Sequence, residues 1–233
     1  MNKTKLTTGV VLLVTFFLIL GAIFMPWFGN GRNGLEFSDD FFNSLAKGSS
    51  NFMEDMRRLA APFKGQTLGV ELTFKDTDTA KKAENLFTKA GAAVEVTGAT
   101  LKINGDLGQV MLAAIDDSET MFNNQGDKVQ ARYNFDPKKV LRTWWTSFKE
   151  LDTALKLQKK FREAKAVNEI VFRAIEPGYN FYGISPQLVR DNIGLLSFLL
   201  VFYVIYTLWY GYGVFELFEG FGLGAEKGHK EEV

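Results

Sequence analysis

Two long stretches without a charged side chain lie near the two ends of the chain. Residues 6–28 and 193–213 are rich in leucine, isoleucine, valine and phenylalanine. At about 1.5 Å per helical residue, each stretch is long enough to cross a hydrocarbon layer of about 30 Å. A helix also bonds its backbone groups internally, as lipid requires. The pattern therefore predicts an integral membrane protein with two transmembrane helices.

The first stretch has one alternative, a cleaved signal peptide, because Lys3 and Lys5 form a short basic region before it. The bulky residues Met25, Pro26 and Trp27 stand where a cleavage site needs small side chains. A retained signal anchor is therefore expected. Long domains translocate largely regardless of charge, and the lysines near the termini slightly favour two cytoplasmic ends. The predicted location is the inner (cytoplasmic) membrane, with the central domain extracytoplasmic.

Apolar residues recur at helical spacing through residues 29–66, which predicts two short amphipathic helices. Their apolar faces are expected either to lie near the bilayer surface or to pack on the domain or on a partner. Residues 29–34 (Gly-Asn-Gly-Arg-Asn-Gly) match the dinucleotide-binding fingerprint in form only. That fingerprint follows a strand, whereas here it follows a membrane helix. No cofactor is predicted from it.

The central part of the chain, residues 67–135, changes between an apolar period of two and helical spacing. Asp76 and Asp106 stand where N-caps of two helices are expected. Strands are predicted at residues 67–74, 94–96, 101–103 and 129–135. The order strand, helix, strand, strand, helix, strand is that of ferredoxin-like (βαββαβ) domains, with another small α+β sandwich as the alternative. The side chains predicted to share its core are Leu72, Leu86, Val96, Ile103, Ile115 and Tyr133.

A long helical region follows, beginning with Asp136 as cap and Pro137 at the first helical position. Its apolar residues recur every three or four positions, as in a helix that packs on another helix. Pro177 and Gly178 are expected to break it. The predicted organisation is residues 1–5 as cytoplasmic N-terminus, 6–28 as first transmembrane helix, 29–66 as amphipathic juxtamembrane region, 67–135 as α+β domain, 136–176 as long helical region, 177–192 as linker, 193–213 as second transmembrane helix and 214–233 as interfacial helix and cytoplasmic tail.

The residue types that much enzyme chemistry needs are missing. The chain has no cysteine, and its one histidine, His229, lies in the polar tail. This excludes thiolate chemistry, histidine metal clusters and the Ser-His-Asp arrangement. Asp116, Asp117 and Glu119 cluster on a predicted helix, but neighbours on a helix point apart and are usually solvated. We therefore expect no catalytic residue, no metal site, no cofactor and no enzyme. Basic residues of the long helix lack interleaved aromatics, so no nucleic-acid partner is expected.

A partner interface is the more economical hypothesis. Tyr203, Tyr206 and Tyr210 recur at i, i+3 and i+7 in the second apolar stretch, and hydroxyl groups within a membrane tend to face protein. In the long helix, Trp144 and Phe148 lie on the apolar stripe. The alternatives are that the tyrosines pair with the first span and that Trp144 closes the domain's own core.

The plan of two terminal spans around an α/β domain with one long helix resembles that of the polysaccharide co-polymerases, which set glycan chain length. Their proline-rich stretch at the second span is not matched, since only Pro177 and Pro186 lie nearby. The resemblance implies a co-polymerase-like oligomer. The function favoured by the sequence is instead a non-enzymatic accessory or scaffold subunit of a larger membrane complex, whose partners are other membrane-protein subunits and the lipid bilayer. An extracytoplasmic ligand-binding or sensory module is the other alternative.

Overall fold

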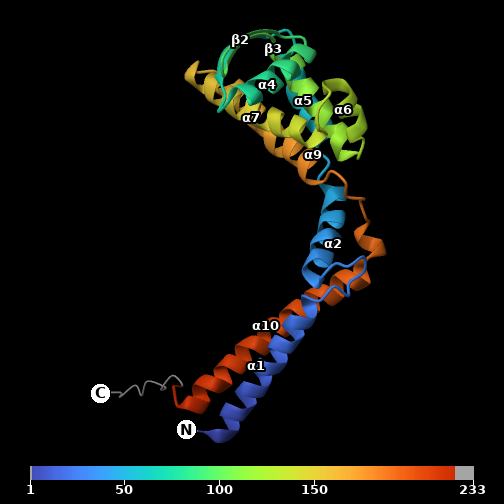
Figure 1. Cartoon of the computed structure of the whole chain (residues 1–233), viewed down its shortest axis with the longest axis vertical. Coiled ribbons are helices and arrows are strands. Elements are labelled where there is room, and N and C mark those ends of the chain that lie inside the picture. Colours follow the sequence, from blue (N-terminus) through green and yellow to red (C-terminus); the bar gives the residue numbers. More distant parts are fainter. Residues whose placement is uncertain (1, 224–233) are drawn as a thin grey trace, which may run out of the picture. The chain divides into compact units, whose positions relative to one another are not determined.

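The computed structural model describes residues 2–223 (Figure 1). The polar tail with His229 lies outside these residues. The chain divides into two compact units, one made of Met1–Leu45 and Gln187–Val233 and the other of Ala46–Pro186. We call the first the helix-pair unit and the second the folded unit, and each is described by itself.

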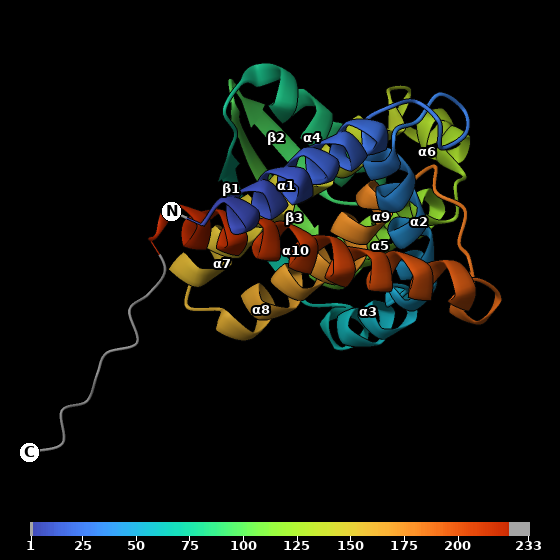
Figure 2. The ribbon, with the colours of Figure 1, turned by 90° about the horizontal axis from the view of Figure 1, so that it is seen from below.

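The helix-pair unit contains two long apolar helices, α1 (Lys3–Ile23) and α10 (Ile193–Phe221). Both are long and apolar enough to cross a membrane, and few of their residues are buried. They pack side by side and run antiparallel, since the amide of Asn2 donates to the carbonyl of Gly220 (3.0 Å) (Figures 1 and 2). The unit also holds most of α2 (Gly34–Ser49) and the short turn η3 (Val189–Asp191). Two terminal helices of this kind are compatible with a two-pass membrane protein.

Glycines let the two apolar helices approach closely. A Cβ atom at Gly9 would lie 2.7 Å from the backbone nitrogen of Leu217, and one at Gly220 would lie 2.7 Å from that of Leu6. Small residues at such crossings are typical of helix pairs in membranes. The side chains of Lys5 and Glu219 form an ion pair at the same end. Because α10 continues unbroken to Phe221, the interfacial helix predicted from residue 214 is part of α10.

The folded unit surrounds a small sheet with helices (Figure 1). Its elements are α3 (Met53–Ala60), η1 (Ala61–Phe63), β1 (Thr67–Thr73), α4 (Thr77–Lys89), β2 (Ala93–Thr97), β3 (Thr100–Asp106), α5 (Leu107–Phe122), α6 (Gly126–Tyr133), α7 (Pro137–Leu157), α8 (Phe161–Ile170), the π-helical turn η2 (Val171–Ile175) and α9 (Glu176–Asn180). The helix starts predicted at Asp76, Asp106 and Asp136 are confirmed, because each carboxylate accepts a backbone N–H from the first turn of its helix.

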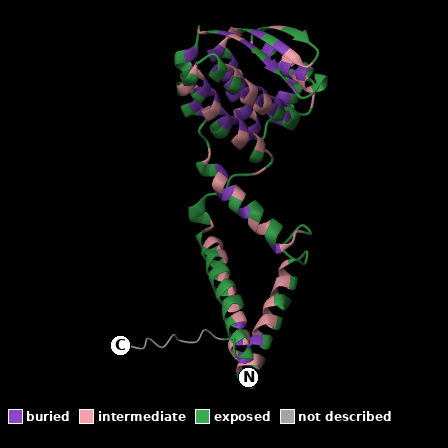
Figure 3. Ribbon diagram, turned by 90° about the vertical axis from the view of Figure 1, so that its left-hand side faces the viewer, coloured by how far each residue is buried: buried purple, intermediate pink, exposed green. Residues whose placement is uncertain are grey.

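The sheet has the strand order β1-β3-β2, with β3 antiparallel to both neighbours. Ile103 in the central strand faces Val70 on one side and Val94 on the other. Alternate residues point into the core, as the period of two predicts. Figure 3 shows buried residues gathered inside the folded unit and few along α1 and α10. Of the predicted core, Val96 is wrong: it is 39% exposed, and every residue of its strand β2 is exposed or only partly buried. The other predicted core side chains are buried, as expected: Leu72, Leu86, Ile103, Ile115 and Tyr133.

The predicted fourth strand is wrong, because residues 126–133 form helix α6. Val129 and Tyr133 are four residues apart, so the same apolar positions fit one face of a helix. Both side chains are buried, and Asn134 ends the helix in the left-handed conformation (φ 62°). The last strand of the ferredoxin-like order is therefore missing. Residues 46–186 form a three-stranded antiparallel sheet amid helices.

The predicted helix break at Pro177 and Gly178 is also wrong. The amide of Glu176 bonds to the carbonyl of Val171, five residues back, and α9 continues through both residues to Asn180. Proline lacks the amide donor, which the first turn of α9 does not need. A Cβ atom on Gly178 would lie 2.7 Å from the carbonyl oxygen of Ser118. The glycine is thus required where α9 packs on α5.

Candidate interaction surface

The tyrosines of α10 divide into two groups. The hydroxyl of Tyr206 donates to the carbonyl of Phe16 (2.9 Å), and the two rings stack with centroids 4.2 Å apart. The indole nitrogen of Trp209 donates to the carbonyl of Leu12 (3.1 Å). These donors therefore hold α10 against α1. For Tyr206, the position agrees with the alternative that the tyrosines pair with the first span.

Tyr203 and Tyr210 keep much of their surface exposed, 68% and 45% respectively. The ring of Tyr210 still lies near that of Phe16, with centroids 4.9 Å apart. Tyr203 lies in the middle of the uncharged stretch of α10, and within the described residues its hydroxyl makes no hydrogen bond. Thr207, one turn further on, donates to the carbonyl of Tyr203 (2.7 Å) and so is satisfied locally. Within the described residues neither the Tyr203 nor the Tyr210 hydroxyl forms a hydrogen bond, and Tyr203 is the more exposed of the two and has no aromatic neighbour on α1.

Trp144 and Phe148 lie elsewhere, at the centre of the folded unit. Both are fully buried, and their rings meet edge to face with centroids 5.7 Å apart. The ring of Phe87 packs on Trp144 from the other side (5.6 Å). The indole nitrogen of Trp144 donates to Asp117 (2.8 Å). A partner could reach these two residues only by opening the core. Their position agrees with the alternative that Trp144 closes the domain's own core, so we do not keep them in the candidate interface.

The carboxylates singled out on α5 have separate surroundings. Asp116 and Glu119 both pair with Arg57 of α3 at the surface. Asp117 is fully buried and accepts hydrogen bonds from Tyr133 (2.6 Å), Trp144 and Arg132. Burial raises the pKa of the Asp117 carboxyl, against the opposing effect of its hydrogen bonds. Asp116 and Glu119 thus share one arginine at the surface, and Asp117 lies apart from them as a buried tie between α5, α6 and α7.

A buried lysine joins the two ends of the folded unit. The ammonium group of Lys47 donates to the carbonyls of Phe181 (3.0 Å) and Ile184 (2.6 Å) and to the side-chain oxygen of Asn124 (3.2 Å). It also lies 5.0 Å from the ring centroid of Phe122. Its acceptors are neutral, and burial lowers the pKa of Lys47. We call this arrangement the Lys47 clamp.

The clamp is completed by the side chain of Asn124. Its oxygen accepts the amide of Gly183 (2.7 Å), and its nitrogen donates to the carbonyl of Ile184 (2.9 Å). The sequence alone did not predict this role for Lys47. The available signal was a lone lysine within the apolar pattern of α2, close to residues that are buried there.

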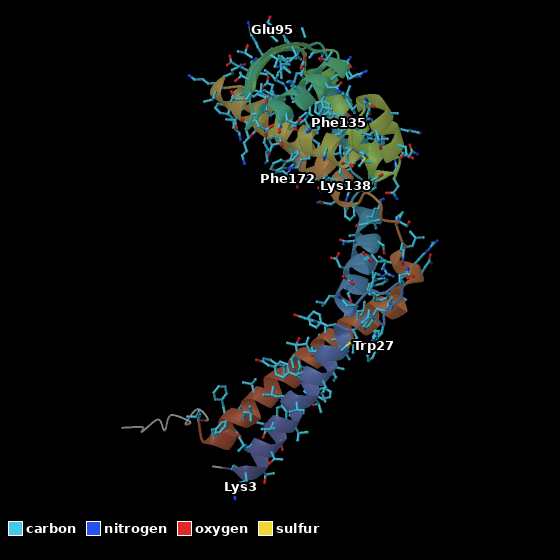
Figure 4. The ribbon with its side chains drawn as sticks, in the orientation of Figure 1. Lys3, Trp27, Glu95, Phe135, Lys138 and Phe172 are labelled. Atoms are coloured by element: carbon cyan, nitrogen blue, oxygen red, sulfur yellow. The ribbon has the colours of Figure 1, made fainter. Side chains whose placement is uncertain are left out.

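A second surface feature lies on α7 and the helices that return along it. Basic and aromatic side chains alternate there, and we call them the basic–aromatic strip: Lys138, Arg142, Trp145, Lys149, Phe172 and Tyr179. Figure 4 labels Lys138 and Phe172 along the same margin of the folded unit, with Glu95 at the opposite margin. The aromatic residues come from different helices, so the sequence of the long helix alone did not show the alternation.

Two open hollows lie on the surface of the folded unit. One of about 210 Å³ lies within the basic–aromatic strip and is bordered by Glu176 and Asn180. The other, of about 600 Å³, is a groove between α3 and α8, most of whose lining side chains are exposed. Among residues 2–223, no group of three or more histidine, aspartate or glutamate side chains is placed to hold a metal ion.

Comparison of the chain with models of protein families, with curated proteins and with solved structures gives no match.

Proposed function

We propose that the chain is a two-pass membrane protein that serves as a non-enzymatic accessory subunit of a larger membrane complex. The observation that carries the proposal is Tyr203, whose hydroxyl lies exposed and unbonded, within the described residues, in the middle of a membrane-length helix. Lipid tails offer no hydrogen-bond partner, and an unpaired hydroxyl in an apolar medium is costly. A neighbouring transmembrane helix supplies the missing acceptor in this proposal.

Two other side-chain donors of α10, those of Tyr206 and Trp209, support the same conclusion because they bond within the chain. Tyr206 and Trp209 already donate to carbonyls of α1. The contact between α10 and α1 therefore does not use Tyr203. Tyr203 lies on a part of α10 that α1 does not cover. Side chains that hydrogen-bond across helices are typical glue between membrane subunits.

Surface properties of the folded unit favour an accessory subunit over a ligand-binding module. A sensor is expected to have an enclosed pocket lined by convergent polar groups, whereas a scaffold exposes apolar surface. Leu157, Phe161 and Phe172 are large apolar side chains that are at least half exposed. The hollow in the basic–aromatic strip, about 210 Å³, is smaller than the roughly 300 Å³ at which ligand pockets usually begin. The groove between α3 and α8 is larger, about 600 Å³, but it is open and most of its lining side chains are exposed.

Removing the hydroxyl of Tyr203 tests the proposal. The chain is purified from its native membrane in a mild detergent, and the mass of the particle is measured by size exclusion with light scattering. We expect a particle heavier than one chain. For Tyr203→Phe we expect a smaller share of the chain in that particle, because one interhelical hydrogen bond contributes about 1 kcal/mol, or about fivefold in association.

Tyr206→Phe is the matched control, since its hydroxyl bonds within the chain and its loss should leave the particle unchanged in mass. A wild-type chain that purifies alone as a monomer contradicts the accessory-subunit proposal. In that case a ligand-binding or sensory module becomes the better explanation.

The proposed orientation has the folded unit on the extracytoplasmic side of the inner membrane. The chain lacks cysteine, so single-cysteine variants report one position each. In intact cells or spheroplasts, an impermeant thiol reagent should label Glu95→Cys, whose side chain is exposed, and should label Lys3→Cys only after the membrane is opened. The reverse labelling pattern would place the folded unit in the cytoplasm.

A further inference from the structure

We propose that the basic–aromatic strip binds the headgroups of anionic phospholipids. The inference rests on the membrane insertion in the proposed function and adds a second, peripheral contact with the bilayer. Three observations support it: the unpaired charges of the strip within the described residues, the positions of its aromatic rings and the short chain segment that joins it to α10.

The cations of the strip are available to a ligand. Within the described residues, Lys138, Arg142 and Lys149 form no ion pair with a carboxylate. Lys149 reaches only the side-chain oxygen of Asn168, at 3.4 Å. The carboxylate that borders the hollow, Glu176, accepts the indole N–H of Trp145 (2.9 Å). Three cations and one carboxylate leave an excess of positive charge, which matches phosphate groups.

The aromatic rings are placed between these cations. The Lys138 nitrogen lies 5.6 Å from the ring centroid of Tyr179, and the Lys149 nitrogen lies 4.8 Å from that of Phe172 and 5.8 Å from that of Trp145. Phe172 is 50% exposed although it is fully apolar. Tryptophan and tyrosine favour the headgroup level of a bilayer, and lysine and arginine favour its anionic surface. One surface therefore offers both kinds of contact.

The chain segment between the strip and α10 is short. Tyr182, whose ring also lies close to Lys138 (6.0 Å), precedes the start of α10 at Ile193 by about ten residues. Even fully extended, a segment of that length spans less than about 40 Å. A weak surface site that is held so close to lipid experiences a high effective concentration of headgroups.

The groove between α3 and α8 is the weaker candidate for an anionic ligand. Two of its four basic residues, Arg58 and Arg173, are paired with Glu54 (3.5 Å) and Glu169 (3.2 Å). The carboxylate of Asp55 also lines the groove, so much of its positive charge is offset. Among residues 2–223, the three cations of the strip form no such pairs. The observations therefore favour the strip.

The test uses the full chain in lipid nanodiscs with one environment-sensitive fluorophore. Asn180→Cys places the label at the hollow of the strip, and Glu95→Cys places it at the opposite margin (Figure 4). In discs with about one third phosphatidylglycerol, the label at residue 180 should shift its emission to shorter wavelength and become accessible to a quencher in the lipid phase. Discs of phosphatidylcholine alone, or about 0.5 M salt, should remove most of the response. The label at residue 95 should not respond.

Charge reversal gives the second arm. Combining Lys138→Glu, Arg142→Glu and Lys149→Glu should raise the anionic lipid fraction needed for half of the response at least severalfold. Three reversals at exposed lysines elsewhere, Lys81→Glu, Lys89→Glu and Lys165→Glu, are the matched control and should leave that fraction unchanged.

Other outcomes overturn the proposal. A silent label at residue 180 in anionic discs, or an equal response in neutral discs, shows that the strip does not bind anionic lipid. A response to soluble polyglutamate but not to lipid assigns the strip to an acidic protein partner instead. A chain that fails to enter the discs contradicts the membrane insertion in the proposed function, whereas an inserted chain with a silent label contradicts only the lipid contact.

Discussion

Replacing Trp144 by alanine is expected to lower the free energy of unfolding of the folded unit by about 3–5 kcal/mol. The side chain is fully buried between the rings of Phe87 and Phe148, so its removal leaves a cavity in the core. It also removes one of the donors to the buried carboxylate of Asp117. Unfolding by urea of the full chain in non-ionic detergent, followed by near-ultraviolet circular dichroism, measures the effect.

The neighbouring Trp145 provides a matched control. Its indole N–H bonds to Glu176 at the surface, and its side chain is only partly buried. Trp145→Ala should therefore lower the free energy of unfolding much less, by on the order of 1 kcal/mol. A loss for Trp145→Ala as large as that for Trp144→Ala would contradict the described core.

Replacing Lys47 by methionine is expected to destabilise the folded unit by about 1–3 kcal/mol, because buried carbonyl groups are left without a donor. Methionine keeps an apolar chain of similar length, so the change removes the ammonium group rather than the packing. The amides near Gly183 should exchange with deuterium faster, since the segment from Phe181 to Ile184 loses its two hydrogen bonds from Lys47 and keeps only the two to Asn124. Lys165→Met, at an exposed position, is the control and should change neither quantity.

The Lys47 variant should also change the dependence of stability on pH. Burial holds the pKa of Lys47 in the folded state below its unfolded value of 10.5. Between these two pKa values the unfolded chain binds more protons than the folded one, so this lysine makes stability rise with pH. The advantage of the wild type over Lys47→Met should therefore grow as the pH rises through that window. An advantage that shrinks over the same window would show that the clamp requires the charged form.

Local signals in the sequence identified elements whose ends are marked chemically. The caps at Asp76, Asp106 and Asp136 each precede a helix in the structure, because a carboxylate at that position satisfies backbone donors of the first turn. Periodicity alone was insufficient at Val129 and Tyr133, where a spacing of four residues fits both a helix and a strand. Tertiary contact settled the outcome, since Tyr133 bonds to the buried Asp117.

The candidate surfaces depended more strongly on contacts distant in sequence. Tyr203 and Tyr206 carry the same side chain three residues apart, and only the position of α1 makes one a contact within the chain and leaves the other exposed. Trp144 and Trp145 are adjacent, yet one lies in the core and the other in the basic–aromatic strip. For Asp117 a signal was present: it shares a helix face with Ala114 and Met121, which are buried.

The Lys47 clamp has a mechanical consequence for the folded unit. Lys47 lies at the start of the unit and Ile184 near its end, and the ammonium group joins the two directly. The chain between Lys47 and Ile184 is thus a loop whose two ends are held together by this hydrogen bond. Tension applied along the chain from either side would load these few hydrogen bonds before it reached the sheet or the side chains around Trp144. The clamp would then act as the first point of failure, and the core behind it would stay intact until the clamp gave way.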